Sequence, residues 1–187
     1  KLVLPSFAFI LFLFLIFKKE EVYEPQIFKG NIMGTTYNII LQSDVSAEDA
    51  HIEAYNILQK VNLEMSTYID DSLISKVNKA DIGQWVTVSQ DFLDVLSFAT
   101  TLCKDTQGIY DVSIGKLVNL WGFGPDSVDK QPSTEELSYF SSQVGCNSIE
   151  TDPTNLSIKK AKDVELDFSS IAKGFALDKV YEFLIKQ

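Results

Sequence analysis

The segment VELDFSSIAKGFALDKV (residues 164–180) restricts the fold most, because its hydrophobic period changes from two to the helical value within a few residues. Val164, Leu166 and Phe168 alternate with acidic residues, as in a strand, and apolar residues from Ile171 onward recur at helical spacing. A strand that leads directly into a helix favours folds in which the two kinds of element are interleaved.

Hairpin signals occur as well, since two strand-like segments at residues 147–151 and 155–159 are joined by the turn sequence TDPTN. Hairpins mixed with strand–helix units predict an α+β domain rather than a doubly wound parallel sheet. Further strands are predicted at GTTYNIILQS (34–43) and QWVTVS (84–89). Helices are predicted to begin at Ser46, at Asp71 or Ser72, at Ser89 and at the capping box Ser133–Glu136, with Gly108 and Gly145 as stop signals.

The composition indicates one globular domain with a hydrophobic core. The chain has 187 residues, of which 45% are hydrophobic, and a formal net charge of −10. Nucleic-acid binding requires a clustered basic surface, whereas the lysines here are dispersed and outnumbered by acidic residues. We therefore expect no nucleic-acid partner.

The two cysteines, Cys103 and Cys146, do not have the spacing of a metal site. Cys103 falls on the apolar face of a predicted helix, so we interpret it as a buried thiol without a chemical role. A disulfide between the two would suit an exported protein, but two residues alone do not establish it.

The first part of the chain has a different character. LVLPSFAFILFLFLIF (residues 2–17) is almost entirely apolar and is flanked by lysines, although it is shorter than the ~20 residues that span a bilayer. We predict a signal peptide or membrane anchor over residues 1–19, a linker over 20–28 and the folded domain over 29–187. An uncleaved anchor is favoured because no small-residue cleavage site follows. Because the sequence starts at lysine, we expect the natural N-terminus to lie upstream.

Two stretches in the first half could contact a ligand. In GNIMGTTYNI, Met33 lies between glycines just before a strand; the residues alone favour a core methionine over a thioether that meets a ligand. In EMSTYIDDSLISKVN, the ring of Tyr68 could stack on a planar ligand, or it could be an ordinary tyrosine at a helix end. Asp70 and Asp71 are interpreted as helix caps.

The stretch GIYDVSIGKLVNLWGFGPD (residues 108–126) combines glycines, aromatic residues and one carboxylate. Asp111 lies among apolar neighbours and therefore needs a hydrogen-bonding partner, which could be a ligand or a backbone turn. The LWGFG part could be an aromatic lid over the core.

The strand–helix junction itself has the chemistry of a phosphate site. A helix N-terminus offers unpaired N–H groups to phosphate, and Lys173 adds a positive charge. Asp167 and Ser170 offer the oxygen ligands that Mg²⁺ prefers. The alternative, that Asp167 and Ser169 cap the helix and Lys173 is solvated, is about equally compatible with the residues.

Two other catalytic motifs, the P-loop and a histidine-based pair, do not occur in this sequence. The glycine and lysine spacing is not that of a P-loop. His51 is the only histidine in this sequence, so no histidine-based catalytic pair or triad can form within this segment.

Taken in order, MGTTY, STYIDDSLISKVN, YDVSIGKLVNLWGFG and LDFSSIAKGFALD resemble the ApbE family of FAD:protein FMN transferases. The resemblance implies an ApbE-like α+β fold and Mg²⁺-dependent transfer of FMN from FAD to a threonine or serine hydroxyl of an acceptor protein, with release of AMP. It also implies an acceptor that is a flavoprotein subunit of a membrane redox complex, and a location at the periplasmic side of the inner membrane.

The resemblance further implies roles for individual residues. Asp167 and Lys173 are the expected catalytic residues, and Ser170, or its backbone carbonyl, is an expected Mg²⁺ ligand. The expected FAD contacts are Met33, Tyr68, Ile109, Tyr110, Asp111, Asp167 and Lys173.

Members of the family are longer, and their remaining Mg²⁺ ligands follow the last segment. We therefore expect this chain alone to bind FAD weakly, if at all, and not to transfer FMN. Other functions compatible with the same residues are a non-catalytic membrane-associated FAD-binding protein and a Mg²⁺-dependent FAD pyrophosphatase.

Overall fold

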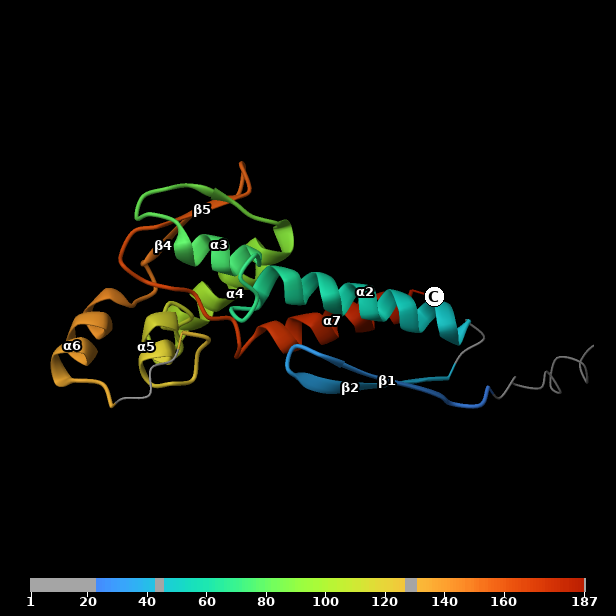
Figure 1. The fold of residues 1–187 in the computed structure, drawn as a ribbon. Helices are drawn as coiled ribbons and strands as arrows, with labels where there is room; N and C mark the ends of the chain where they lie inside the picture. Colours follow the sequence, from blue (N-terminus) through green and yellow to red (C-terminus); the bar gives the residue numbers. More distant parts are fainter. Residues whose placement is uncertain (1–22, 43–45, 127–130, 187) are drawn as a thin grey trace, which may run out of the picture.

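The computed structural model describes residues 23–42, 46–126 and 131–186, and it confirms an α+β chain (Figure 1). The helices are α2 (Ala47–Met65), α3 (Leu73–Lys79), α4 (Gln90–Asp105), α5 (Gly115–Leu120), α6 (Thr134–Gln143) and α7 (Ala172–Leu184). The strands are β1 (Gln26–Ile32), β2 (Thr35–Leu41), β3 (Val86–Thr87), β4 (Ile149–Asp152) and β5 (Ser157–Lys160).

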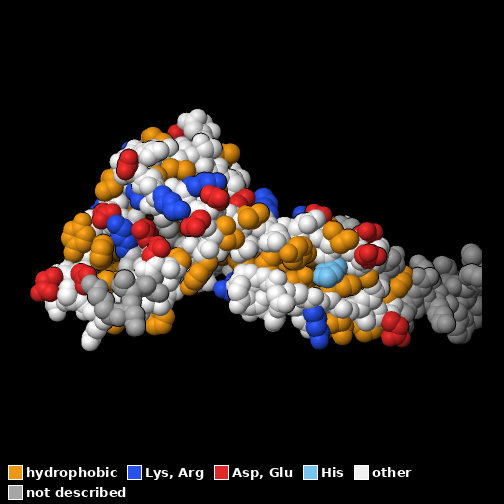
Figure 2. Space-filling view, in the orientation of Figure 1, with side chains coloured by type: hydrophobic (Ala, Val, Ile, Leu, Met, Phe, Trp, Pro, Cys, Tyr) orange, Lys and Arg blue, Asp and Glu red, His pale blue; other side chains and the backbone are white. Residues whose placement is uncertain are grey.

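The chain forms two small antiparallel sheets around the helices. The hairpin β1–β2 lies along the helix pair α2 and α7, and the sheet of order β3-β5-β4 lies near α3 and α4 at the other end (Figure 1). Apolar side chains gather where the hairpin meets the helices (Figure 2). The strand–helix junction of residues 164–171 connects these two parts of the molecule.

Four helices begin at serines that the sequence predicted as caps, and of the two alternatives for the second helix, Asp71 or Ser72, the cap is Ser72. Ser46, Ser72, Ser89 and Ser133 each accept a hydrogen bond from the backbone N–H three residues later. At Ser133 the capping box is complete, because the Glu136 carboxylate also accepts from the Ser133 N–H at 2.9 Å. These starts are confirmed because capping depends on residues close in sequence.

The core lies between α2, α4, α7 and the extended segment before α7. Phe92 and Phe168 are fully buried, and their ring centroids are 5.0 Å apart. The buried residues of α2 are Ala50, Ala54, Leu58, Val61 and Met65. The packing of α2 on α7 therefore fixes where α7 begins relative to the end of α2.

The strand β1 was not predicted. It pairs with β2 from Gln26↔Leu41 to Ile32↔Thr35, so residues 26–28, expected in the linker, belong to the hairpin. Met33 and Gly34 form its two-residue turn, and both have positive φ, 51° and 69°. This is the backbone that tight hairpins require, and it favours glycine at the second position.

The interpretation of Cys103 as a free thiol is wrong. Cys103 and Cys146 form a disulfide that joins the last turn of α4 to the segment before β4. Cys103 is buried, as predicted, but the position of its partner depends on the fold of the intervening chain, because the two are 43 positions apart.

Two predicted strands are shorter than expected. QWVTVS forms only the two-residue strand β3, and the segment from Val164 to Phe168 is extended but makes a single parallel bridge, Glu165 with Ile114. The predicted alternation of residues 164–168 is nevertheless confirmed, because Val164, Leu166 and Phe168 are at most 1% exposed.

The predicted signal peptide or anchor over residues 1–19 lies outside the described residues and stays a prediction. In the part of the chain that the structure describes, no helix has both the length and the apolar character needed to cross a membrane.

Candidate functional site

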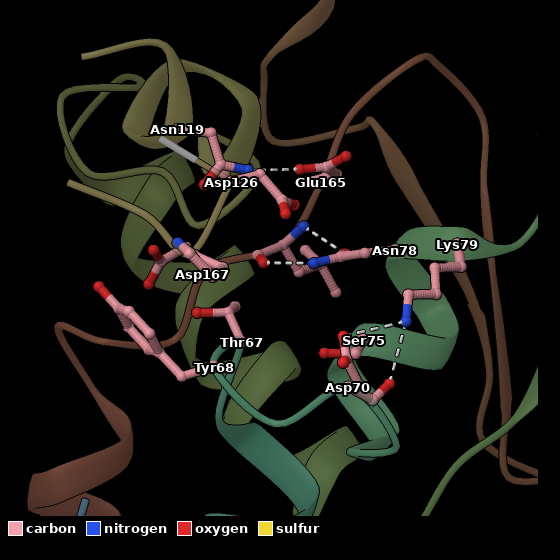
Figure 3. A pocket seen from close by; sticks show the side chains of 13 residues that line it. Thr67, Tyr68, Asp70, Ser75, Asn78, Lys79, Asn119, Asp126, Glu165 and Asp167 are labelled. Carbon is pink, nitrogen blue, oxygen red and sulfur yellow. Dashed lines mark hydrogen bonds and ion pairs between the residues drawn. The ribbon is translucent and has the colours of Figure 1, made fainter. Parts of the chain in front are cut away.

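Two adjoining clefts lie where α2 ends and α7 begins, and they share Thr67 and Tyr68. The larger, here the Met33 cleft, has a volume of about 620 Å³, and its lining includes Met33, Tyr68 and Lys173. The smaller, here the Asp167 cleft, has a volume of about 170 Å³ and is shown in Figure 3. Three predicted FAD contacts from distant parts of the sequence thus line one cleft, and a fourth lines its neighbour.

Met33 reaches its cleft from the tip of the β1–β2 hairpin. The positive φ of this non-glycine residue is an uncommon, strained conformation. Its side chain packs partly against the core and also lines the cleft. Both interpretations of Met33 are therefore partly met: it contacts the core, and it remains accessible to a bound molecule.

Tyr68 lies between the two clefts and is 66% exposed. Its hydroxyl donates a hydrogen bond to the carbonyl oxygen of Phe123 at 2.8 Å, which ties it to the LWGFG segment. Trp121 and Phe123 are 51% and 76% exposed, so this segment is not a lid over the core. The free ring face of Tyr68 can stack on a planar group.

The N-terminus of α7 contributes Ser169, Ala172 and Lys173 to the Met33 cleft. Within the described chain no side chain caps this helix; the N-cap position is Ile171. Asp167 accepts from the Ser169 N–H at 2.7 Å and so closes the turn before the helix, not its first turn. The capping part of the alternative is thus wrong, whereas Lys173 is exposed, as that alternative expected. A helix N-terminus without a side-chain cap keeps N–H groups that can bind an anion.

The predicted contacts at residues 109–111 line neither of the two clefts. Ile109 is 91% exposed, and the Tyr110 hydroxyl is 3.1 Å from the Ser170 Oγ. Asp111 accepts from both the N–H and the Oγ–H of Ser113 at 2.8 Å. The backbone-turn alternative for Asp111 is therefore the one observed, and Asp111 lines a separate small cavity.

The Asp167 cleft is rich in carboxylates, since Asp70, Asp126, Glu165 and Asp167 all line it (Figure 3). Burial raises the pKa of Glu165, although nearby lysines and a hydrogen bond from Asn119 Nδ2 at 3.1 Å oppose that shift. The sequence gives no reason to assign a role to Glu165, because an acidic residue that alternates with buried positions is expected to face solvent.

A Mg²⁺ ion would need oxygen donors from this region. Among the described residues, no three His, Cys, Asp or Glu side chains converge as a metal site. Mg²⁺ is commonly held by only one or two carboxylates together with substrate phosphates. The Asp167 carboxylate is a donor of that kind and lines the Asp167 cleft. Ser170 is a second, exposed oxygen donor before α7, but it lines neither cleft and its Oγ is 3.1 Å from the Tyr110 hydroxyl.

Comparison with known proteins gives a consistent answer. The model of the ApbE family matches residues 33–187. A FAD:protein FMN transferase of Haemophilus influenzae is 42% identical over 164 residues, which are 83% of this chain and 47% of the relative. The protein of the same description from Vibrio cholerae is 37% identical over 90% of this chain and 51% of the relative.

The fold agrees as well. The apo crystal structure of the Pseudomonas stutzeri flavinyl transferase ApbE has a TM-score of 0.83 and 29% identity, covering 90% of this chain and 57% of that one. The chain spans about half the length of the curated relatives it matches.

Proposed function

This chain belongs to the ApbE family, and from that premise we propose that it provides the FAD-binding part of a Mg²⁺-dependent FAD:protein FMN transferase. One observation supports this most: Met33, Tyr68 and Lys173 line one cleft at the uncapped N-terminus of α7, beside Asp167. A cleft of about 620 Å³ lies within the usual range for small-molecule and cofactor sites.

The reaction joins the acceptor hydroxyl oxygen to the phosphorus of the FMN half of FAD while the hydroxyl loses its proton to solvent, and the P–O bond to the AMP phosphate breaks, so that AMP leaves with the bridging oxygen. Catalysis of such phosphoryl transfer depends on positioning and on neutralising charge. Lys173 and the N–H groups of α7 would bind the diphosphate, and the ring of Tyr68 with the thioether of Met33 would hold a planar ring of FAD. Mg²⁺, held by Asp167 and Ser170 with the phosphates, would supply further neutralisation.

We also propose that the acceptor is a flavoprotein subunit of a membrane redox complex and that transfer takes place on the periplasmic side of the inner membrane. The disulfide Cys103–Cys146 supports this location, because disulfides persist in oxidising compartments such as the periplasm. The apolar run at residues 2–17 supports membrane attachment.

The test uses the full-length natural protein with FAD, MgCl₂ and a purified candidate acceptor, scored by covalent flavin fluorescence of the acceptor in a denaturing gel. Asp167→Asn and Lys173→Met should each abolish labelling, while omission of Mg²⁺ should do the same. The exposed pair Lys104→Met and Asp105→Asn at the end of α4 serves as the control and should label normally.

Normal labelling by both site variants would show that the site is assigned incorrectly. Release of AMP from FAD at the same rate with and without acceptor would instead identify a pyrophosphatase. Stable FAD binding without AMP release would identify a non-catalytic flavin-binding protein.

A further inference from the structure

We propose that Asn78 is a positioning residue for Asp167, an inference that rests on the function proposed above. Asn78 lies near the end of α3, and its side chain meets the main chain of Leu166 with both of its polar atoms. Asn78 Nδ2 donates to the Leu166 carbonyl oxygen at 2.9 Å, and the Leu166 N–H donates to Asn78 Oδ1 at 2.7 Å. Figure 3 shows the Asn78 amide directed at the segment that carries Glu165 and Asp167.

Together with hydrogen bonds from residues 112–115, these two bonds hold the peptide groups on either side of Leu166. The Leu166 carbonyl belongs to the same peptide group as the Asp167 N–H, which donates to the Val112 carbonyl at 2.8 Å. In the preceding peptide group, the Glu165 carbonyl accepts from the Gly115 N–H at 2.8 Å. Both planes are thus held at both ends, by Asn78 on one side and by residues 112–115 on the other.

The close approach on that other side depends on Gly115. A Cβ at this position would lie 2.8 Å from the Glu165 carbonyl oxygen, a distance that real Cβ atoms do not adopt. Residues 112–115 can therefore pair with the segment only because a glycine is present. On the opposite edge, none of the strands that the structure describes is paired with Leu166, and the Asn78 amide takes the place of one.

Asn78 is itself held from a third direction. Its main-chain carbonyl oxygen accepts a hydrogen bond from Lys160 Nζ at 2.6 Å, and Lys160 is 6% exposed. The oxygen and one N–H of the side-chain amide are engaged by Leu166, although Asn78 also contributes to the lining of the Asp167 cleft. These two bonds to the main chain are the basis for a positioning role.

The consequence for Asp167 is geometric. Burial of Leu166 and Phe168 determines which face of the segment the Asp167 side chain leaves from, but packing tolerates rotation of the peptide planes. The hydrogen bonds of Asn78, together with those of residues 112–115, remove that freedom, so the carboxylate is held where the diphosphate and Mg²⁺ are expected. Loss of partners that orient a metal-site carboxylate typically costs 10–100-fold in metal affinity or activity.

The experiment compares Asn78→Leu, which keeps the volume but removes both bonds, with Val95→Ala in the full-length natural protein. Val95 is buried in the core on α4, so its truncation lowers stability without touching either cleft. For Asn78→Leu we expect the MgCl₂ concentration at half-maximal FMN transfer to rise about 10–100-fold. For Val95→Ala we expect it to stay within about twofold of wild type, at a comparable loss of thermal stability.

Asn78→Asp provides a variant that retains the acceptor for the Leu166 N–H. Its ionised carboxylate cannot donate to the Leu166 carbonyl, but the protonated acid can. Its Mg²⁺ defect relative to wild type should therefore shrink as the pH is lowered, while that of Asn78→Leu should not.

An unchanged Mg²⁺ requirement in Asn78→Leu, or an equal rise in Val95→Ala, would overturn the positioning role of Asn78. A defect of Asn78→Asp that is independent of pH would do so as well. Failure of the wild-type protein to label any acceptor counts against the proposed function instead, so the two failures are distinguishable.

Discussion

Reduction of the Cys103–Cys146 disulfide should destabilise the protein by several kcal/mol. The bond closes a loop of 43 residues that contains α5, α6 and the LWGFG segment, and Cys103 is only 2% exposed. In the chain-entropy model, opening such a loop returns about 13 cal/mol/K to the unfolded chain, or about 4 kcal/mol at 25 °C. That is a large part of the 5–15 kcal/mol by which most folded domains are stable.

The assay is urea unfolding of the oxidised and the reduced protein, followed by the fluorescence of Trp85 and Trp121. With a denaturant dependence of about 2 kcal/mol/M, the midpoint should fall by about 2 M on reduction. The double variant Cys103→Ala, Cys146→Ala is the control, and its midpoint should be the same with and without reductant. The native oxidised protein should show no thiol that reacts with a colorimetric reagent.

Two results would refute this reasoning. Equal midpoints for the oxidised and reduced protein would mean that the loop is already restrained in the unfolded chain or that the bond strains the native state. Two reactive thiols in the untreated protein would mean that the disulfide does not form.

Three further predictions concern single side chains. Tyr68→Ala should weaken FAD binding to the full-length protein by about 10–100-fold through loss of ring stacking, whereas Tyr68→Phe should lose about tenfold or less, measured by quenching of FAD fluorescence. Burial raises the pKa of Asp91, but hydrogen bonds from Lys60 at 2.6 Å and Lys179 at 3.1 Å outweigh it and hold the pKa below its ordinary value. Asp91→Asn should therefore cost about 1–2 kcal/mol at pH 7 in urea unfolding, and the difference from wild type should vanish as the pH falls through that lowered pKa. Burial raises the pKa of Glu165, so its effect on stability is opposite to that of Asp91: the folded state favours the protonated acid and loses stability as the pH rises through that pKa. Glu165→Gln should therefore raise the melting temperature at pH 8 but not at pH 4. An equal rise at both pH values would contradict this prediction.

The sequence was sufficient wherever the determining interactions are local. Helix starts at Ser46, Ser72, Ser89 and Ser133 were predicted because the hydrogen bond of a cap spans only three residues. The strand β1 was missed for the opposite reason. Its sequence QIFKGNI has little clean alternation, and it is a strand because it pairs along its whole length with β2.

In the candidate site, too, the sequence was sufficient for local features and insufficient for those that depend on the fold. The junction chemistry of Asp167 and Lys173 was visible in the sequence, because one strand-to-helix turn carries both residues. Their proximity to Met33 and Tyr68 follows from the hairpin and from the packing of α2 on α7, and only the family resemblance anticipated it. For Asp111 the sequence left open whether its hydrogen-bonding partner is a ligand or a backbone turn. In the structure the partner is a turn, because the Ser113 N–H donates to the Asp111 carboxylate.

Asn78 illustrates why the support of a site is harder to predict than its reactive residues. Its partner Leu166 is 88 positions away, and a single asparagine near a helix end has no periodicity that would mark it. The alternation of residues 164–168 predicted correctly which side chains are buried, but alternation does not specify what pairs with the backbone at each edge. A strand pattern can be satisfied by one side-chain amide in place of a neighbouring strand, because such an amide offers both a donor and an acceptor. Where a strand pattern leads into a helix and only part of it pairs with other strands, the polar residue that completes its hydrogen bonds is therefore the first to consider as a positioning residue.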